Sequence, residues 1–433
     1  MKQQLLSAVQ RAEASLGSDR IRSPPSRPGA MVFAAAHGDR VVISRREELG
    51  VQIAVIGAGA WGLPAAARLA ERGHHVILLD RDGVLNEWSS SLGPTRLWRI
   101  ADPDPLRARL SARAVEAMRR LQSRSGSAVF LRRGLLWRDS ESLEPVIENL
   151  RALDAGCVEV AAGDVGRYFP GLRPDGRGAV WAADAGIVLA EASLQAQYRL
   201  FVRAGGVRAF GRTVTSITVE DNTVRLVLDR GDDALAVDRV VVAAGARAGA
   251  LLPGLGLEIP LRPYLEQVVH FGAVRDRGAT NEFPCLFDGP RASEPGIYAM
   301  PSPGLGYKVG MDAPLRVLTE GDRDRAPDPE RTQSIRQRVQ CDFGAVEPTV
   351  LGAQVCSWTD SPDGNFVVDM VGDRVVLACG DCGEGFKFSA LMGEILADLA
   401  EGRGVDDDVA AWGLARFANG VPVSTGPHLL GRH

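Results

Sequence analysis

Two lysines stand out in a chain that otherwise uses arginine for its cations. Of the 50 Lys and Arg residues, only Lys2, Lys308 and Lys387 are lysine. The two internal lysines lie in the stretches GYKVGMD and GFKFS, where glycines and aromatic residues flank them. An ammonium is a compact point charge, whereas a guanidinium is a planar fork that needs more room. The question is which chemistry needs a compact cation at these two positions.

A glycine-rich turn near residue 57 is typical of a dinucleotide-binding fold. The segment VQIAVIGAGAWGLPAAARLAERGHHVILLDRD predicts a strand, a tight turn, a helix and a second strand. Gly57 permits the turn, Gly59 lets a pyrophosphate approach the backbone, and Gly62 allows the helix to pack closely on the strand. Asp80 ends the second strand, where a carboxylate can bind ribose hydroxyls. The set predicts a bound dinucleotide and does not separate NAD from FAD; the alternative is a turn that binds no ligand.

Later segments return to the same predicted sheet. DRVVVAAGARAGALLPGLG, from Asp238, and DRVVLACGDCGEGFKFSALMGEILADLAEG, from Asp373, are apolar strands that run into glycine-rich turns. Shorter runs such as GLLWRD, GAVWAA and LEQVVHF suit a mostly antiparallel sheet. We therefore expect an α/β (α+β) fold, in which a Rossmann-type domain built from discontinuous segments carries an inserted β domain. The expected segments are 51–132, 192–260 and 352–420 for the first domain, and 133–191 and 261–351 for the second.

Composition narrows the class of protein. A formal charge of −4 gives no basic surface for nucleic acid. The six histidines show no metal-ligand spacing, and no paired C-x-x-C set appears among the six cysteines. The scattered cysteines indicate reduced thiols, so we expect a cytoplasmic protein. The apolar run after residue 51 contains glycines, a proline and Arg68, which argues against a membrane span. Residues 1–50 are expected to form a disordered extension, and residues 421–433 a flexible tail.

Six further segments occur in a fixed order along the chain and carry a family resemblance. They are GPTRLWRIA, DAGIVLAEA, EIPLRPYLEQVV, GLGYKVGMD, GAQVCSWTDSPDGNFVVD and GDCGEGFKFS. With the glycine motif, they resemble the FAD-dependent amine oxidases of the monomeric sarcosine oxidase and N-methyltryptophan oxidase group, within the D-amino-acid-oxidase-like family. The resemblance covers roughly residues 51–415 and implies FAD as the cofactor of the Rossmann-type domain.

The resemblance implies roles for residues around the flavin. Lys308 would lie against the flavin ring, where an ammonium stabilises the negative charge that develops when oxygen is reduced; the alternative is a lysine paired with a carboxylate. Cys356 aligns with the cysteine that bonds covalently to the flavin 8α-methyl group; the alternative is a small buried side chain. Arg96 would stabilise negative charge on the reduced ring. The other cofactor-binding residues assigned are Gly57, Gly59, Gly62, Asp80, Val214, Gly245, Gly380, Gly383 and Gly385.

The resemblance also implies a site for a substrate carboxylate. Lys387 matches a family lysine that, with an arginine, clamps this group, and Arg99 would be the partner. If so, the substrate is an amino or imino acid. The alternative for Arg96 and Arg99, three residues apart, is a pair of surface cations on one face of a turn.

Three positions depart from the family pattern. Asp312 and Glu384 replace histidines, and Trp358 replaces a tyrosine. The two carboxylates predict a substrate with an additional cationic or hydrogen-donating group, unless both pair with local arginines. Trp358 could stack on a flat ring or form a wall of the cavity, and Tyr298 is aligned as a further substrate contact in a segment shorter than its counterpart.

The sequence thus predicts an FAD-dependent oxidase that converts a secondary amine, or an amino or imino acid, to an imine and passes the electrons to O2, with release of H2O2. We expect a substrate other than sarcosine, such as a cyclic imino acid or a natural-product precursor. The alternatives are a dehydrogenase that uses a quinone or a protein acceptor, and a flavin-binding protein without activity. A monomer or small homo-oligomer is expected, with neither nucleic-acid nor membrane partners.

Overall fold

The computed structural model describes residues 50–229, 234–291, 294–418 and 427. The extension expected at 1–50 lies outside the described residues apart from residue 50, and so does the tail expected at 421–433 apart from residue 427. No helix within the described ranges is long and apolar enough to cross a membrane.

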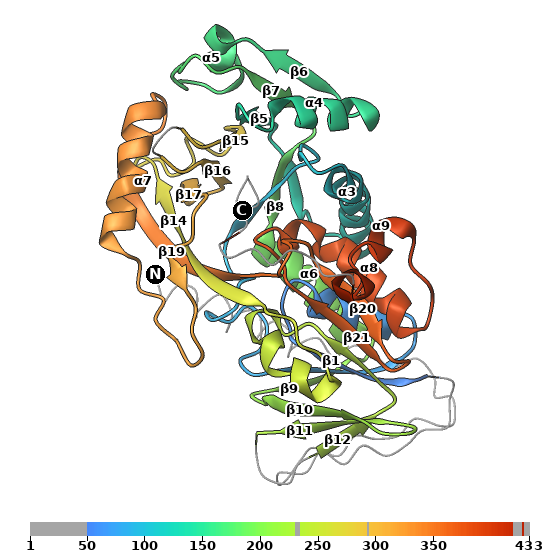
Figure 1. Cartoon of the computed structure of the whole chain (residues 1–433). Coiled ribbons are helices and arrows are strands. Elements are labelled where there is room, and N and C mark those ends of the chain that lie inside the picture. The colour runs from blue at the N-terminus through green and yellow to red at the C-terminus, as the bar shows by residue number, and fades with distance from the viewer. Residues whose placement is uncertain (1–49, 230–233, 292–293, 419–426, 428–433) are drawn as a thin grey trace, which may run out of the picture. The chain divides into compact units, whose positions relative to one another are not determined.

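The glycine motif belongs to a six-stranded sheet assembled from distant parts of the chain (Figure 1). Five of its strands pair in parallel, and the sixth, β20, adds an antiparallel edge. The strands are nearly all apolar because both faces of a parallel sheet are covered. In sheet order they are β20 (Val367–Val371), β21 (Val375–Cys379), β13 (Arg239–Val242), β1 (Gln52–Ile56), β2 (His75–Asp80) and β9 (Val207–Phe210).

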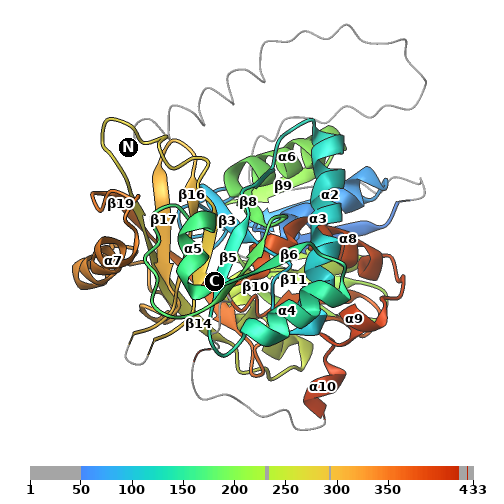
Figure 2. The same cartoon turned by 90° about the horizontal axis from the view of Figure 1, so that it is seen from above.

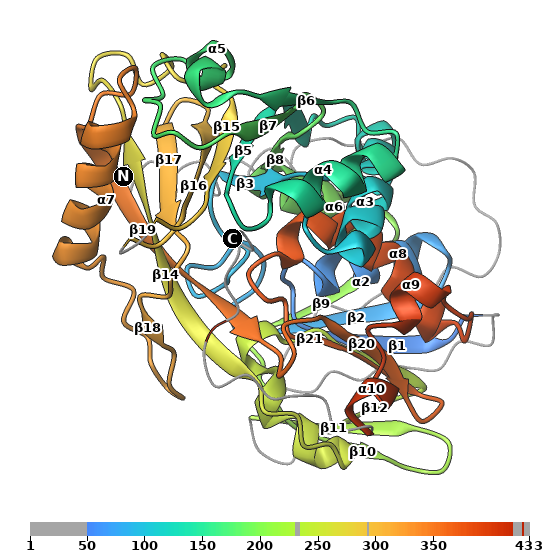
Figure 3. The same ribbon diagram turned by 45° about the horizontal axis from the view of Figure 1, so that its top comes forward.

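Helices cover one face of this sheet and a small sheet covers the other. Ile53 and Val55 of β1 pack into a core with α2, α3, α6 and α8, which Figure 2 shows together. Ala54 and Ile56 point the other way, into a core with β10, β11 and β12 (Figure 3). The bounds are α2 (Gly62–Glu71), α3 (Pro105–Ser125), α6 (Ala190–Arg203), α8 (Ser389–Ala400), β10 (Val214–Val219), β11 (Val224–Leu228) and β12 (Ala234–Val237).

The second domain is built on a nine-stranded sheet. Its neighbours pair antiparallel except β15 and β5. Helix α7 (Pro329–Asp342) covers one face, where its Ile335 and Val339 pack with Val269 and Val309 (Figure 1). In sheet order the strands are β18 (Arg316–Val317), β14 (Arg262–Phe271), β17 (Gly306–Met311), β16 (Ile297–Ser302), β15 (Cys285–Asp288), β5 (Leu135–Arg138), β7 (Ala179–Ala182) and β6 (Cys157–Val160), while β19 (Val350–Asp360) also pairs with β14.

The expected fold class is confirmed: a Rossmann-type parallel sheet is joined to a mostly antiparallel one. The sequence placed residues from 352 onward in the cofactor domain, but β19 pairs along its length with β14 of the nine-stranded sheet. This pairing bears on the boundary at residue 352, and the expected domain boundaries as a whole stay a prediction. The remaining elements are β3 (Thr95–Trp98), β4 (Phe130–Arg132) and β8 (Gly186–Leu189), which form a small antiparallel sheet, and α4 (Leu143–Ala152), α5 (Val165–Tyr168), α9 (Asp407–Ala410) and α10 (Ala415–Ala418).

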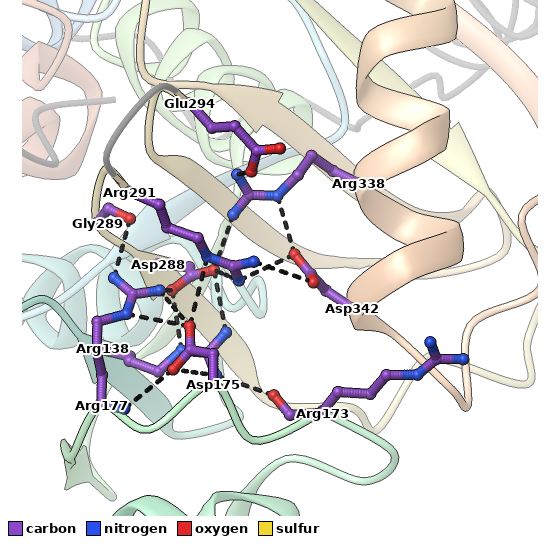
Figure 4. Close-up of polar contacts among 10 residues, drawn as sticks. All are labelled: Arg138, Arg173, Asp175, Arg177, Asp288, Gly289, Arg291, Glu294, Arg338 and Asp342. Atoms are coloured by element: carbon purple, nitrogen blue, oxygen red, sulfur yellow. Dashed lines mark hydrogen bonds and ion pairs between the residues drawn. The ribbon is translucent and has the colours of Figure 1, made fainter.

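A network of buried charges ties α7 to the ends of two interior strands of the nine-stranded sheet (Figure 4). The Asp288 carboxylate at the end of β15 is fully buried and accepts hydrogen bonds from four guanidinium groups. Arg138 of β5 donates at 2.9 and 3.0 Å, Arg177 at 2.6 Å, Arg291 at 2.8 Å and Arg338 of α7 at 3.0 Å. Other carboxylates, including Asp175 and Asp342, pair with these arginines in turn. A buried carboxylate is tolerable only with such partners.

Replacing Asp288 with Asn should lower the free energy of unfolding by about 3–5 kcal/mol at neutral pH, because buried guanidinium groups lose their counter-charge. Burial alone would raise the pKa of Asp288, but Arg138, Arg177 and Arg291 outweigh it and hold the pKa below the usual 3.8. A depressed carboxyl pKa stabilises the fold above the unfolded-state pKa, and this stability is lost as pH falls. The difference between variant and wild type, measured by urea unfolding, should therefore shrink in acid.

Asp164→Asn is the control, because its partner Arg167 is 78% exposed. This variant should cost at most about 1 kcal/mol. Equal effects of the two substitutions would show that the Asp288 network does not stabilise the fold.

Candidate active site

A cavity of about 860 Å³ lies between the turns of the six-stranded sheet and the nine-stranded sheet. Its volume is within the range of about 300–1,000 Å³ that is usual for ligand sites. Gly57, Gly59 and Asp80 line it from the first sheet, and Lys308 and Cys356 line it from the second. The other residues predicted from the sequence that line it are Arg96, Val214, Gly245, Tyr298, Trp358, Gly380, Gly383 and Gly385.

Each of the three motif positions requires glycine for a different steric reason. Gly57 has a φ of +106°, and a β-carbon there would lie 2.2 Å from the Ala243 carbonyl oxygen. A β-carbon on Gly62 would lie 1.9 Å from the carbonyl oxygen of Gly57, so helix and turn meet without room for a side chain. At Gly59 the nearest atom is the Ser91 Oγ, at 3.1 Å. At Gly59, unlike at Gly57 and Gly62, an added β-carbon would meet no backbone atom of the protein but would project beside the cavity. The missing side chain there leaves the backbone open to close approach by a phosphate.

Asp80 also anchors the turn itself. Its carboxylate accepts hydrogen bonds from the amides of Ala58 at 2.8 Å, Asp82 at 2.8 Å and Gly83 at 2.7 Å. The residue therefore joins the glycine turn to the end of β2 while it borders the cavity. The cradle, the helix start at Gly62 and this acid fit a dinucleotide such as FAD.

Strand register places the second half of the site on one face of the nine-stranded sheet. Side chains alternate between the faces of a strand, so directly paired residues share a face. Glu266 pairs with Cys356 across β14 and β19, and Met300 pairs with Lys308 across β16 and β17. All four line the cavity, whereas Val269, Ala299 and Val309, on the opposite face of these strands, pack with α7. Sequence reasoning missed Glu266, although it is the one acidic residue in the strand RPYLEQVVHF.

Tyr298 lies across β17 because residue 310 is glycine. The two residues are paired, and a β-carbon on Gly310 would come within 2.2 Å of the tyrosine ring. The missing side chain lets the phenol ring reach over the neighbouring strand. Trp358 is on β19 and borders the same cavity. Its side chain is 3% exposed, and its ring centre lies 5.3 Å from that of Tyr264.

Lys308 is buried without a carboxylate partner among the described residues. Its side chain is 3% exposed and its ammonium donates to the carbonyl of Thr95. Burial, followed by the nearby charge of Arg96, lowers the pKa of Lys308 well below its usual range, and no carboxylate within the described ranges opposes this. The alternative of a lysine paired with a carboxylate is therefore not what the structure shows. A negative charge arriving in the cavity would favour the ammonium form.

Arg96 and Cys356 border the same cavity. The Arg96 guanidinium donates to the carbonyl oxygens of Ser90 and Leu92 at 2.7 Å and stands 5.4 Å from the centre of the Phe386 ring. These hydrogen bonds fix the guanidinium to neutral acceptors. Burial raises the pKa of the Cys356 thiol, and Arg96 opposes the increase.

Arg99 and Lys387 belong to a buried charge cluster, made up of Arg99, Asp102, Arg107, Glu384 and Lys387. Asp102 lies 2.7 Å from Arg99 and 3.4 Å from Lys387, and Glu384 lies 3.1, 3.2 and 3.6 Å from Arg99, Lys387 and Arg107. Although burial opposes it, the charges of Arg99 and Lys387 hold the pKa of Asp102 at about 2. None of the five lines the cavity.

The two predicted carboxylates thus differ in their surroundings. Glu384 pairs with cations of the cluster, which is the alternative that the sequence left open. Asp312 is 3% exposed, follows β17 on the cavity-facing side of the register, and lies outside the cavity lining. Asp102 was missed by sequence reasoning, although an acid three residues after Arg99 is a typical spacing for an ion pair on a turn.

Comparison with known proteins agrees with this geometry. The family model described as DAO, FAD dependent oxidoreductase, matches residues 52–399. The chain belongs to this family. It is 26% identical to the monomeric sarcosine oxidase of Arthrobacter sp. strain TE1826 over 84% of this chain and 96% of the relative. It is 24% identical to the N-methyl-L-tryptophan oxidase of Citrobacter koseri over 84% and 98%. The expected resemblance is confirmed.

Solved structures of the same fold include enzymes with different named substrates. NikD in its open form, described as an unusual amino acid oxidase essential for nikkomycin biosynthesis, superposes with a TM-score of 0.75 at 22% identity, over 88% of this chain and all of the other. The L-proline dehydrogenase of P. horikoshii gives a TM-score of 0.73 at 20% identity over 86% and 99%. These likenesses establish the fold.

Replacing Gly310 with Ala should destabilise the protein by about 1–3 kcal/mol, because the added methyl group displaces the Tyr298 ring. In a Tyr298→Ala background the same substitution should cost almost nothing. Urea unfolding of the two single variants and the double variant gives the coupling. Gly163→Ala is the control, since nothing lies within 4 Å of a β-carbon there. Additive effects of the Gly310 and Tyr298 substitutions would contradict the contact.

Proposed function

We propose that this protein is an oxidase of a secondary amine, or of an amino or imino acid, in which O2 takes the electrons and H2O2 is released. The observation that carries the proposal is Lys308: a buried cation without a carboxylate partner in the described structure, on the cavity face that it shares with Cys356. Neither a dehydrogenase nor an inactive flavin-binding protein needs such a cation beside its cofactor.

The residues of the cavity would hold the cofactor at two points. The turn at Gly57 and Gly59 would receive the pyrophosphate, and the Cys356 sulfur would bond to the flavin ring. When bound, FAD supplies the two-electron chemistry that no side chain of the protein can provide. The task of the chain is then to fix the substrate against this group and to stabilise charge around it.

Lys308 and Arg96 would supply the positive charge. Each donates its hydrogen bonds to backbone carbonyls in the described structure, and Glu191 is the carboxylate there that acts on Arg96 electrostatically. Negative charge that develops on oxygen beside Lys308 would bring the depressed pKa of that lysine back up and bind the ammonium more tightly.

The buried charge cluster supports a carboxylate-bearing substrate with a second polar group. Three cations face two carboxylates, with the partly exposed Asp104 at the edge, 3.7 Å from Arg107. A substrate carboxylate would compete with Asp102 and Glu384 for Arg99 and Lys387. A substrate with its own hydrogen-donating group could satisfy the displaced carboxylates, which favours compounds larger than sarcosine. The relatives named for N-methyltryptophan and for nikkomycin biosynthesis suit this class, as does a role in natural-product synthesis.

The flavin-loaded enzyme should be bleached without oxygen by at least one member of a panel of sarcosine, N-methyl amino acids, proline, pipecolate and primary D- and L-amino acids. Admission of O2 should restore the colour. Lys308→Met should slow the reaction with O2 by about 10²–10³-fold, because a preorganised charge is lost, while the anaerobic bleaching rate stays close to that of wild type. Stopped-flow absorbance measures both rates.

The anaerobic step is the internal control for an intact site. Bleaching by an amine with slow recolouring in wild type would favour the dehydrogenase, and a loaded flavin that no compound bleaches would remove the amino-acid substrate class. Equal recolouring of wild type and Lys308→Met would contradict the role given to Lys308.

A further inference from the structure

Glu266 is a buried carboxylate whose charge nothing in the described structure satisfies. Its side chain is 2% exposed, and neither carboxylate oxygen has a hydrogen-bond partner of good geometry among the described residues, although the amides of Gln267 and Met311 lie near enough to act on it. This contrasts with Asp288 and Asp102, which are buried with several cations around them. An unsatisfied buried carboxylate is costly and rare, so a native one calls for a partner that arrives from outside.

The position of Glu266 says where that partner would lie. It is paired with Cys356 on β19, and directly paired side chains have β-carbons about 4.5–5.5 Å apart. It lines the cavity on the face that Tyr298 and Lys308 share. The carboxylate therefore borders the space in which the reaction would take place.

The groups around Glu266 do not neutralise it. Arg331 of α7 is the cation that acts on it most strongly, but its guanidinium donates to the carbonyls of Ala313 at 2.9 Å and Pro314 at 2.8 Å. Asp312 adds charge of the same sign, and Tyr298 and Cys356 offer no cation.

Together these effects make the Glu266 carboxylate a stronger base than usual. Burial raises the pKa of Glu266 well above its usual range, and Arg331 and the amides of Gln267 and Met311 offset this only in part. A carboxylate of raised pKa is a stronger base than an ordinary one, so it can take a proton from a cation that enters the cavity.

We propose that Glu266 binds the amino group of the substrate and shares one proton with it. This inference rests on the function proposed above and adds the residue that selects the amine. In the exchange the N–H bond of an ammonium breaks, an O–H bond forms on the Glu266 carboxylate, and the nitrogen keeps the bonding electron pair. The neutral amine then has the lone pair that a C=N bond requires. A carboxylate of ordinary pKa would instead hold the amine as an unreactive ammonium.

The experiment compares pairs of ligands that differ only in the nitrogen. Proline is paired with cyclopentanecarboxylate, pipecolate with cyclohexanecarboxylate, and sarcosine with butanoate. Dissociation constants come from the change in the flavin spectrum of the loaded enzyme, without oxygen and before reduction, for wild type, Glu266→Gln and Glu266→Asp. Glu266→Gln should weaken binding of the amine about 10- to 100-fold and leave the carbon analogue unchanged, because one charge-assisted hydrogen bond is lost. Glu266→Asp should recover part of the loss.

Four outcomes are distinguishable. Selective loss of the amine supports the inference. Equal loss of amine and carbon analogue in Glu266→Gln overturns it, because the residue then only shapes the cavity. Failure of a folded Glu266→Gln variant to retain flavin, with thermal unfolding as the check on folding, overturns it in favour of a cofactor contact. If no amine perturbs or reduces the wild-type flavin, the proposed function fails first and the inference fails with it.

Discussion

The register of β19, β14, β17 and β16 is the constraint on which the site depends. Because side chains alternate along each strand, pairing Glu266 with Cys356 and Met300 with Lys308 sends both pairs toward the cavity. Apolar residues on the opposite face of these strands pack with α7 in one hydrophobic core. A slip of one residue in any of these pairings would exchange the two faces and bury the site against the helix. The Asp288 network, which ties α7 to the end of β15, supports the same arrangement.

The buried charged groups fall into two kinds: those surrounded by partners of opposite charge, and those without such partners in the described structure. Asp288 is surrounded by four guanidinium groups, and the buried charge cluster matches cations with carboxylates at 2.7–3.6 Å. Such closed sets hold elements together and resist a change in protonation. Lys308 and Glu266 lack partners of opposite charge in the described structure, and both lie on the cavity. Groups with strongly shifted pKa values at a cavity are typical of reacting sites.

Local patterns made the cofactor half of the site predictable. Gly57, Gly62 and Asp80 are set by a strand, a turn and a helix that follow one another in sequence, and the structure gives each a steric or hydrogen-bonding reason. Lys308 stood out because lysine is rare in this chain. The sequence could not show that Glu384 and Asp102 would close around Arg99 and Lys387, since these contacts span 285 residues. Nor could it pair β19 with β14, which is what gives Glu266 its place.

We propose that the flavin ring lies against the cavity face of the nine-stranded sheet, and peptide mapping would test this position. The flavin-loaded protein would be denatured in acid and digested, and the flavin-bearing peptide identified by mass spectrometry. We expect the flavin to stay with the polypeptide and to map to Cys356, the cysteine on the cavity face of β19. Release of the flavin by acid, or attachment at any of the other five cysteines, would contradict the placement of the ring against Cys356, Lys308 and Glu266.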